Sequence, residues 1–294
     1  MRPEPGADGG GAGYPRRMVT STDVRLPDGG VLRAHDSGAD APGAPVLAWH
    51  HGSPQTGAPL EPVLAAAAAR GIRVISYGRP SYGGSTARPG RDVASAADDL
   101  AAVAEAFGVT GLASMGASGG GPHALAGAAL RPGLVRAAVT LAGIAPRTDA
   151  YDWFDGMASP DGLRAAMRGR AARAAFAETD EFDPTQFVAA DYAALEGGWA
   201  SLGADVGRSD AFGPDGLIDD DVAFAAPWGF DPAAISVPVL VVQGALDRVV
   251  PPAHGAYLAS VIPGAELRVR PDDGHVSVLD AVPEAMDWVL AKLR

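Results

Sequence analysis

The chain has 294 residues, of which 47% are hydrophobic and 20% charged, a composition typical of a globular protein with a large core. Its formal net charge of -12 would repel nucleic-acid backbones and anionic membranes, so we expect neither as a partner. The absence of cysteine excludes disulfides, thiolate catalysis and cysteine metal sites.

Residues 1–17 combine glycine, proline and charged side chains without a central apolar run. We therefore expect a flexible tail rather than a secretory signal. No stretch of the sequence approaches the roughly 18 uninterrupted apolar residues of a membrane span. The simplest expectation is a cytoplasmic protein.

The next segments predict a β-hairpin, because Arg17–Leu26 and Val31–His35 are separated by the turn sequence PDGG. Further along, short β-rich runs alternate with segments rich in Ala and Leu, several of which begin with proline, as first helical turns often do. This alternation predicts a mostly parallel sheet with helices on both faces and the hairpin at its edge. The predicted strands are Val46–His50, Arg73–Tyr77, Leu112–Met115, Ala137–Leu141, Val239–Gln243 and Leu267–Arg270, and the predicted helices are Pro59–Arg70, Asp92–Phe107, Pro122–Leu130, Pro252–Val261 and Pro283–Leu293.

The alternation stops near Arg147 and resumes near Pro238. The segment between them carries helical patterns and many acidic side chains, and it ends at the rigid sequence PWGFDP. We therefore expect one α/β domain, formed by residues 18–146 and 233–294, with residues 147–232 inserted as a helical cap.

The sequence GASGG at positions 116–120 matches G-x-S-x-G, the pattern of a nucleophile elbow. In such an elbow a strained turn between a strand and a helix presents the serine, and tiny flanking residues let neighbouring backbones approach. With 39 glycines in the chain the spacing alone is weak evidence. A predicted strand precedes the match and a helix beginning at Pro122 follows it, so we predict Ser118 as the nucleophile.

An elbow serine needs an acid and a histidine, which follow it in that chain order. Asp247 comes just after the strand Val239–Gln243, where ligand-facing residues of open α/β sheets collect, and is the predicted acid. His275 lies in the loop between the last strand and the last helix, from which its ring could reach Ser118, and is the predicted base.

Three nearby residues are alternatives for these roles. His254 follows Asp247 closely and is the main competing base. Asp272 and Asp273 could hold His275 in place of Asp247, although loop acids of this kind more often face solvent.

Acyl transfer also requires two preorganised hydrogen-bond donors for the developing oxyanion. The backbone N–H of Gly119, directly after the nucleophile, would supply one. We assign the second to the N–H of Ser53, in the loop after the strand Val46–His50, where Gly52 lets the backbone turn. His51 would then hold this turn by hydrogen bonding rather than act in catalysis.

Five motifs taken together resemble the α/β-hydrolase superfamily. The resemblance extends from about Met18 to the end of the chain and is weakest across residues 147–232. It implies an α/β-hydrolase fold with an eight-stranded core and a helical cap, a Ser118–Asp247–His275 triad, and neither a metal nor an organic cofactor. The motifs are HHGSP at 50–54, GRPSYGGS at 78–85, GASGGGPHALA at 116–126, QGALDRVVP at 243–251 and DGHVSVLD at 273–280.

The cap is similar in sequence to that of bacterial hydrolases labelled proline iminopeptidase-like, through IDDD at 218–221 and PWGFD at 227–231. True proline iminopeptidases carry tryptophan directly after the catalytic serine, where this chain has Gly119, so the resemblance argues against aminopeptidase activity. The acidic run Asp219–Asp221 could bind a substrate amine, but a solvated charge run or a helix cap is the favoured interpretation.

These features predict a carboxylesterase-like serine hydrolase that cleaves an ester, thioester or amide bond of a small organic substrate through an acyl-enzyme on Ser118. Two alternatives stay open: a cofactor-free lyase, C–C bond hydrolase or perhydrolase of the same fold, and a ligand receptor. Aromatic residues that could line an apolar pocket are Tyr82, Trp153, Phe154, Trp199 and Trp228.

Overall fold

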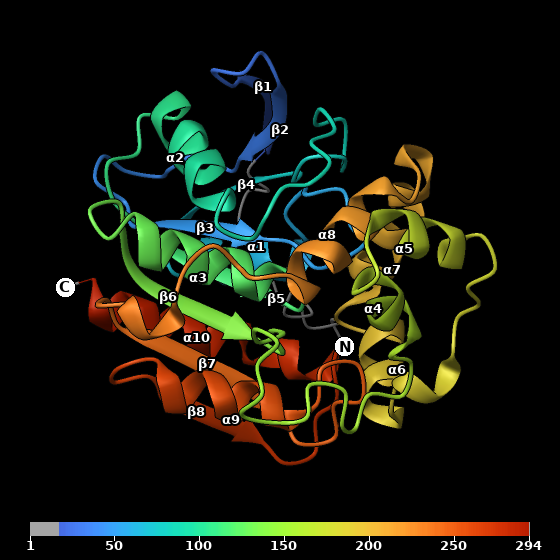
Figure 1. The fold of residues 1–294 in the computed structure, drawn as a ribbon. Coiled ribbons are helices and arrows are strands. Elements are labelled where there is room, and N and C mark those ends of the chain that lie inside the picture. Colours follow the sequence, from blue (N-terminus) through green and yellow to red (C-terminus); the bar gives the residue numbers. More distant parts are fainter. Residues whose placement is uncertain (1–17, 294) are drawn as a thin grey trace, which may run out of the picture.

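The computed structural model describes residues 18–293 and contains the predicted mostly parallel, eight-stranded sheet (Figure 1). The predicted tail, residues 1–17, lies outside the described residues. The two hairpin strands pair antiparallel with each other, and the second of them pairs antiparallel with β4, whereas all the other neighbours are parallel. In sheet order the strands are β1 (Thr20–Arg25), β2 (Val31–Asp36), β4 (Arg73–Tyr77), β3 (Val46–His50), β5 (Leu112–Ala117), β6 (Val135–Leu141), β7 (Val239–Gly244) and β8 (Glu266–Arg270).

Each face of the sheet buries its own hydrophobic cluster, because successive strand residues point to opposite faces. Leu47 and Trp49 of β3 belong to the cluster on one face, and Ala48 between them belongs to the cluster on the other. Residues 239–242 of β7 alternate in the same way. The inner strands are therefore continuous apolar runs, as expected for parallel strands covered on both sides.

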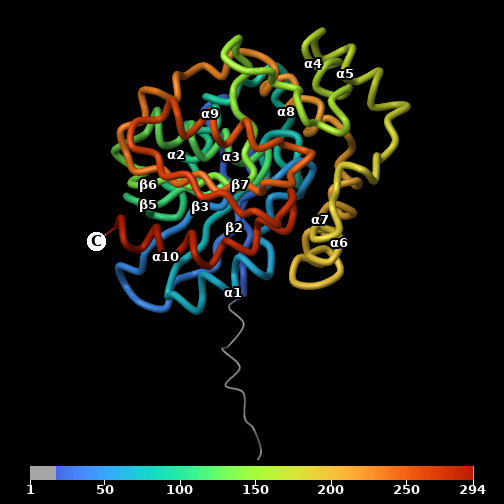
Figure 2. The backbone as a smooth tube through the Cα atoms, turned by 90° about the horizontal axis from the view of Figure 1, so that it is seen from below, coloured from blue at the N-terminus to red at the C-terminus, as the bar shows by residue number. Residues whose placement is uncertain are grey.

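Five helices cover the two faces, as Figure 2 shows in a view along the sheet. All five were expected from the sequence, and the largest difference is that α2 begins at Ala96 rather than at Asp92, because Asp92 accepts a hydrogen bond from the Ser95 N–H and forms a turn there. No helix within residues 18–293 is both long and apolar enough to cross a membrane. On one face lie α2 (Ala96–Ala106), α3 (Gly120–Leu130) and α9 (Pro252–Val261), and on the other α1 (Glu61–Ala68) and α10 (Val282–Lys292).

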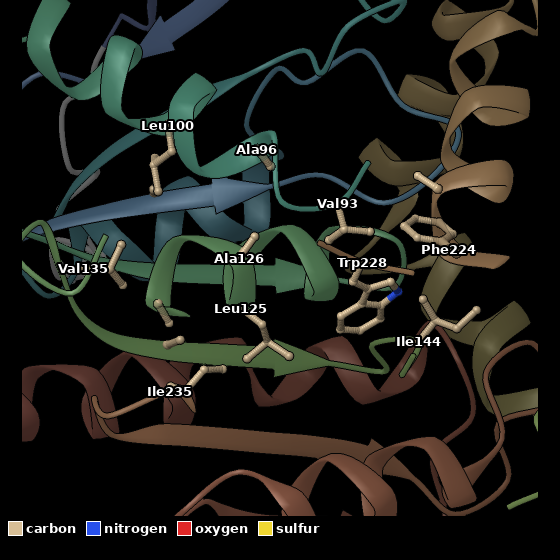
Figure 3. Close-up of a cluster of buried hydrophobic side chains, with 14 of the residues drawn as sticks. Val93, Ala96, Leu100, Leu125, Ala126, Val135, Ile144, Phe224, Trp228 and Ile235 are labelled. Atoms are coloured by element: carbon tan, nitrogen blue, oxygen red, sulfur yellow. The ribbon is translucent and has the colours of Figure 1, made fainter. Parts of the chain in front are cut away.

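Helix α3, which follows the predicted elbow, has more buried residues than the other four, and Figure 3 shows part of the cluster around it. A Cβ atom at its Gly127 would lie 3.0 Å from Leu100 of α2 and 3.2 Å from Val135 of β6, so glycine here lets the three elements pack closely. Leu125 and Ala126 beside it are completely buried. Burial of each large aliphatic side chain contributes about 1.5–3 kcal/mol, so this packing holds the start of α3 in place.

Five further helices lie in sequence between β6 and β7, and we call them the inserted helices. They stand beyond the carboxyl ends of the parallel strands (Figure 1), with α6 and α7 to one side of the sheet (Figure 2). Within the group, α4 and α5 pack against α8, and α6 packs against α7. Their bounds are α4 (Asp161–Ala166), α5 (Arg170–Ala177), α6 (Ala189–Glu196), α7 (Ala200–Ser209) and α8 (Asp215–Ala225).

Leu125→Ala should lower the free energy of unfolding by about 2–5 kcal/mol, because the truncation leaves a cavity in a fully packed cluster. Leu130 lies on the same helix but is 37% exposed, so Leu130→Ala should change the free energy by only about 0.5 kcal/mol. Urea unfolding followed by circular dichroism measures both values. Equal losses in the two variants would contradict the described packing of α3.

Candidate active site

Ser118 occupies the turn between β5 and α3. Its backbone φ angle is 51°, in the left-handed region that is strained for a residue with a side chain. A Cβ at Gly116 would collide with the backbone of Gly120, and a Cβ at Gly120 would collide with the backbone of His50. The glycines of GASGG thus permit a sharp strand-to-helix turn, which leaves Ser118 partly exposed at the carboxyl end of β5.

Ser118, His275 and Asp247 are joined by hydrogen bonds at the carboxyl ends of β5, β8 and β7. His275 Nε2 lies 2.9 Å from Ser118 Oγ, and its Nδ1 lies 2.8 Å from Asp247 Oδ2. The other oxygen of Asp247 accepts hydrogen bonds from the N–H groups of Val249 and Val250, both at 2.9 Å. Because an ionised carboxylate only accepts, Nδ1 of His275 carries the ring proton and Nε2 can accept the serine proton.

The pKa of His275 differs from those of the other five histidines. Burial disfavours the charged ring, but the Asp247 carboxylate outweighs burial and raises the pKa of His275 above its ordinary value of 6.5. Burial lowers the pKa values of all the others. The competing base, His254, has its pKa lowered to about 4 and bonds to the Ala145 N–H at 3.1 Å and the Trp153 carbonyl at 3.0 Å. His254 is therefore a neutral packing residue that makes no bond to Ser118.

The other acidic side chains of the His275 loop are engaged elsewhere. Asp273 forms an ion pair with Arg270, and Asp272 is exposed. The structure thus brings Asp247, and neither loop acid, to the ring of His275. Within residues 18–293, no group of three or more His, Asp or Glu side chains is arranged to hold a metal ion.

The loop after β3 lies against the turn that carries Ser118. A Cβ at Gly52 would be 3.6 Å from the Cβ of Ser118, and a Cβ at Gly119 would be 2.6 Å from Ser53 Oγ. Across the described residues, neither the Ser53 N–H nor the Gly119 N–H donates a hydrogen bond. Two free N–H groups beside a serine hydroxyl are what oxyanion binding requires.

His51 fixes the direction of the Ser53 N–H. Its Nε2 accepts a hydrogen bond from the Arg79 N–H at 3.2 Å, so Nδ1 carries the proton and donates to the Gly52 carbonyl at 2.6 Å. That carbonyl and the Ser53 N–H belong to one planar trans peptide and point in opposite directions. By holding the carbonyl, His51 sets where the N–H points.

A buried charge network supports the same loop. Asp220 of α8 is fully buried and pairs with Arg79 at 2.6 Å and with Arg91 at 2.5 Å. It also accepts hydrogen bonds from Ser53 Oγ and, at 2.9 Å, from the Tyr82 hydroxyl. Burial alone would raise the pKa of Asp220, but the guanidinium groups of Arg79 and Arg91 hold it well below its usual range. One ionised side chain thus ties α8 to the loop after β3.

The expectation that Asp219–Asp221 is a solvated charge run or a helix cap is wrong. All three carboxylates are buried, because α8 packs this part of its surface against arginine-bearing segments that are distant in sequence. Since each is already paired, none is free for a substrate amine. The sequence does not predict Arg79 as the partner of Asp220, because nothing marks this arginine beyond its place in the motif GRPSYGGS. The ion pairs are Asp219–Arg170, Asp220–Arg79, Asp220–Arg91 and Asp221–Arg173.

The five aromatic residues predicted to line a pocket are all packed against protein groups, and all except Phe154 are buried. Which of them contacts a substrate stays a prediction. The Tyr82 hydroxyl donates to Asp220, the indole N–H of Trp153 donates to the Ala145 carbonyl, and that of Trp199 donates to Asp280. Phe154 packs against Trp153 and Arg164. Trp228 packs with Val93, Ile144 and Phe224 in the cluster of Figure 3.

Phe224 of α8 is the aromatic residue that the structure places beside the nucleophile. Its ring would lie 3.1 Å from a Cβ at Gly119, and Ser53 Oγ would be closer still. A larger side chain directly after Ser118 would therefore have to displace Ser53 Oγ and the Phe224 ring. No sequence signal singles out Phe224, because it lies in an ordinary helical pattern more than 100 residues from the elbow.

Asp220→Asn should lower the free energy of unfolding by about 3–5 kcal/mol, because it leaves two guanidinium groups buried without a charge partner. Asp215 lies on the same helix and pairs with Arg170 at the surface, so Asp215→Asn should cost about 1 kcal/mol or less. Urea unfolding of both variants gives the comparison. Similar losses would show that burial of the Asp220 network adds nothing to stability.

Comparisons with known proteins agree with this fold. A family model described as the α/β-hydrolase fold matches residues 45–282, whereas no curated protein matches the chain. A solved hydrolase from Pseudomonas aeruginosa PA01 is 25% identical with a TM-score of 0.67, over 93% of this chain and 98% of that one. An esterase from Rhodococcus sp. ECU1013 is 24% identical with a TM-score of 0.70 (92% and 98% covered), and a bromoperoxidase from Bacillus anthracis is 21% identical with a TM-score of 0.70 (93% and 99% covered). As its motifs predict, the chain belongs to the α/β-hydrolase fold family.

Proposed function

We propose that this protein is a serine hydrolase that cleaves an ester, thioester or amide bond of a small organic molecule through an acyl-enzyme on Ser118. The observation that carries the proposal is the continuous line of hydrogen bonds from Ser118 Oγ through His275 to Asp247. Membership of the α/β-hydrolase fold family and the esterases among the structural neighbours also support it.

The proposed reaction has two halves. His275 Nε2 takes the proton of Ser118 as Oγ attacks the substrate carbonyl carbon, and Asp247 stabilises the resulting imidazolium through Nδ1–H. The N–H groups of Ser53 and Gly119 bind the oxyanion. The leaving group departs with the proton from His275. Water then loses a proton to the same ring and attacks the acyl carbon. The bond from that carbon to Ser118 Oγ breaks, His275 returns the proton to Oγ, and the acid is released.

We place the substrate beside Ser118 and the Phe224 ring, between the sheet and a cap formed by residues 147–232. Contact of the substrate with the five predicted aromatic residues stays a prediction. Gly119, packed against Ser53 and Phe224, favours esterase over proline iminopeptidase activity, because true proline iminopeptidases carry tryptophan at this position. The similarity of the cap to iminopeptidase-like hydrolases stays a prediction.

Reaction with a fluorophosphonate probe tests the proposal, since only an activated serine is labelled. Ser118→Ala should abolish labelling and reduce hydrolysis of p-nitrophenyl esters by about 1000-fold or more. Ser260→Ala, which removes a surface hydroxyl, should change neither. An unlabelled wild-type protein would contradict the hydrolase assignment and favour a ligand receptor.

Labelling would not separate hydrolysis from the other reactions open to this fold, and product analysis does so. Release of an acid and an alcohol from an ester supports hydrolysis. Peracid formation in the presence of hydrogen peroxide would indicate a perhydrolase, in which peroxide replaces water in the second half-reaction. Turnover of natural substrate candidates without uptake of water would indicate a lyase.

The ratio kcat/KM should rise with pH through the pKa of His275, because only the neutral ring accepts the serine proton. Since the Asp247 carboxylate raises that pKa, the midpoint should lie above pH 6.5. Asp247→Asn removes the charge, so it should move the midpoint to lower pH and reduce the plateau by about 10³–10⁴-fold. Asp272→Asn, at an exposed position, should leave the profile unchanged. A midpoint that moved with Asp272 and not with Asp247 would reassign the acid.

A further inference from the structure

Asp191, near the start of α6, is a fully buried carboxylate outside the line that joins Ser118 to Asp247. Its Oδ1 accepts hydrogen bonds from the N–H groups of Val276 and Ser277, at 2.8 and 2.9 Å, and lies 3.0 Å from Ser277 Oγ. Its Oδ2 accepts from the N–H of Val188 at 3.0 Å. A single side chain of the inserted helices thus binds the two residues that directly follow His275.

The residue before His275 is held from the same side. A Cβ at Gly274 would collide with Asp191 Oδ2 and would lie 2.6 Å from Val188 Cγ2. The Gly274 N–H also donates to Ser277 Oγ at 2.8 Å, which links both sides of the histidine through the hydroxyl that contacts Asp191. The backbone around His275 therefore rests on α6.

This contact does something that Asp247 cannot do. Asp247 orients the ring of His275 through one hydrogen bond, but it does not fix the backbone from which the ring extends. Asp191 accepts hydrogen bonds from the N–H groups of Val276 and Ser277, which lie at the start of the 3₁₀ helix Ser277–Ala281. The first N–H groups of a helix have no partner within it, so they need one from outside. A carboxylate also interacts favourably with the partial positive charge of that helix end.

We propose that Asp191 is a positioning residue for His275: its carboxylate fixes the histidine loop to α6, so that Nε2 stays within reach of Ser118. This inference rests on the proposed function. It gives the inserted helices a direct part in assembling the site in addition to covering it.

Two other buried aspartates of the inserted helices provide a comparison. Asp205 of α7 accepts hydrogen bonds from the N–H and hydroxyl of Thr56, at 3.0 and 2.7 Å, and Asp220 binds Ser53 and Arg79. Both therefore contact the loop after β3, and Asp220 also contacts Arg79, which packs against that loop. Of the three, Asp191 alone binds the loop of His275, so Asp205 offers a matched control of equal burial.

The charged groups around the His275 ring come from three elements. Asp247 follows β7, Asp191 comes from α6, and Asp273 of the ring's own loop is neutralised by Arg270. The charge of Asp191 favours the protonated ring, as the charge of Asp247 does. Loss of Asp191 should therefore lower the pKa of His275 as well as displace its ring, and a residue that only stabilised the fold away from the ring would not move that pKa.

The test compares Asp191→Asn with Asp205→Asn in the full chain. In Asp191→Asn we expect kcat for p-nitrophenyl esters to fall by about 10- to 100-fold with little change in KM, because a slightly displaced base loses near-attack geometry. The pKa of His275, followed by NMR of the ring C–H and assigned with His275→Gln, should fall. In Asp205→Asn that pKa should stay at the wild-type value. A folded Asp191→Asn with wild-type kcat would overturn the proposal, whether or not the pKa of His275 falls.

Ser277→Ala keeps the test decisive if Asp191→Asn does not fold. It removes the hydroxyl that joins Asp191 to Gly274 without changing any charge, so kcat should fall while the pKa of His275 stays constant. A wild-type kcat in folded Ser277→Ala would count against the positioning role. The NMR titration needs no substrate, so it tests the Asp191 contact even if the wild type fails to react with fluorophosphonate, which would instead refute the proposed function.

Discussion

The carboxylate of Asp220, buried between the guanidinium groups of Arg79 and Arg91, is the interaction on which the arrangement of the site depends. It connects α8 to the segment after β4, to the segment before α2 and, through Ser53, to the loop after β3. Breaking a buried ion pair is far more costly than losing a surface one, so these segments keep one relative position. Donors held in advance bind a developing charge without reorganisation, which suits the proposed role of the Ser53 N–H.

The same principle governs how the inserted helices attach to the sheet. Asp191, Asp205 and Asp220 are each completely buried, and each accepts several hydrogen bonds. Asp191 binds the loop of His275, whereas Asp205 and Asp220 bind the loop after β3 and Arg79 beside it. Apolar packing alone would tolerate small shifts between the two parts. Hydrogen bonds to carboxylates are directional and costly to leave unmade, so they specify position as well as contributing stability. In this strongly negative chain, some aspartates are therefore buried and join the inserted helices to the loops at the sheet.

The backbone of the turn that carries Ser118 is strained, and the packing around the turn offsets the cost of this strain. A left-handed residue with a side chain costs about 1–3 kcal/mol. Two backbone bonds keep the turn closed, from the Ser118 N–H to Leu141 and from the Gly121 N–H to Ser118, each at 2.9 Å. The apolar side chains of α3 and its neighbours together contribute more than this strain costs. The core of the protein therefore maintains the exposure of its candidate nucleophile.

The sequence by itself determined the features that depend on local pattern and chain order. Apolar runs of strand length, proline-started helices and the small residues around Ser118 are legible without a structure, and chain order selects Asp247 and His275, which the structure brings together with Ser118. Only the tertiary structure decided which charged side chains are buried and which residues they pair with. Asp220 lies 141 residues from Arg79, and nothing in its acidic surroundings distinguishes a buried partner from a solvated run. The bonds of Asp191 to the His275 loop likewise span 85 and 86 residues. Burial and ion pairing are properties of surfaces that meet only when the chain has folded.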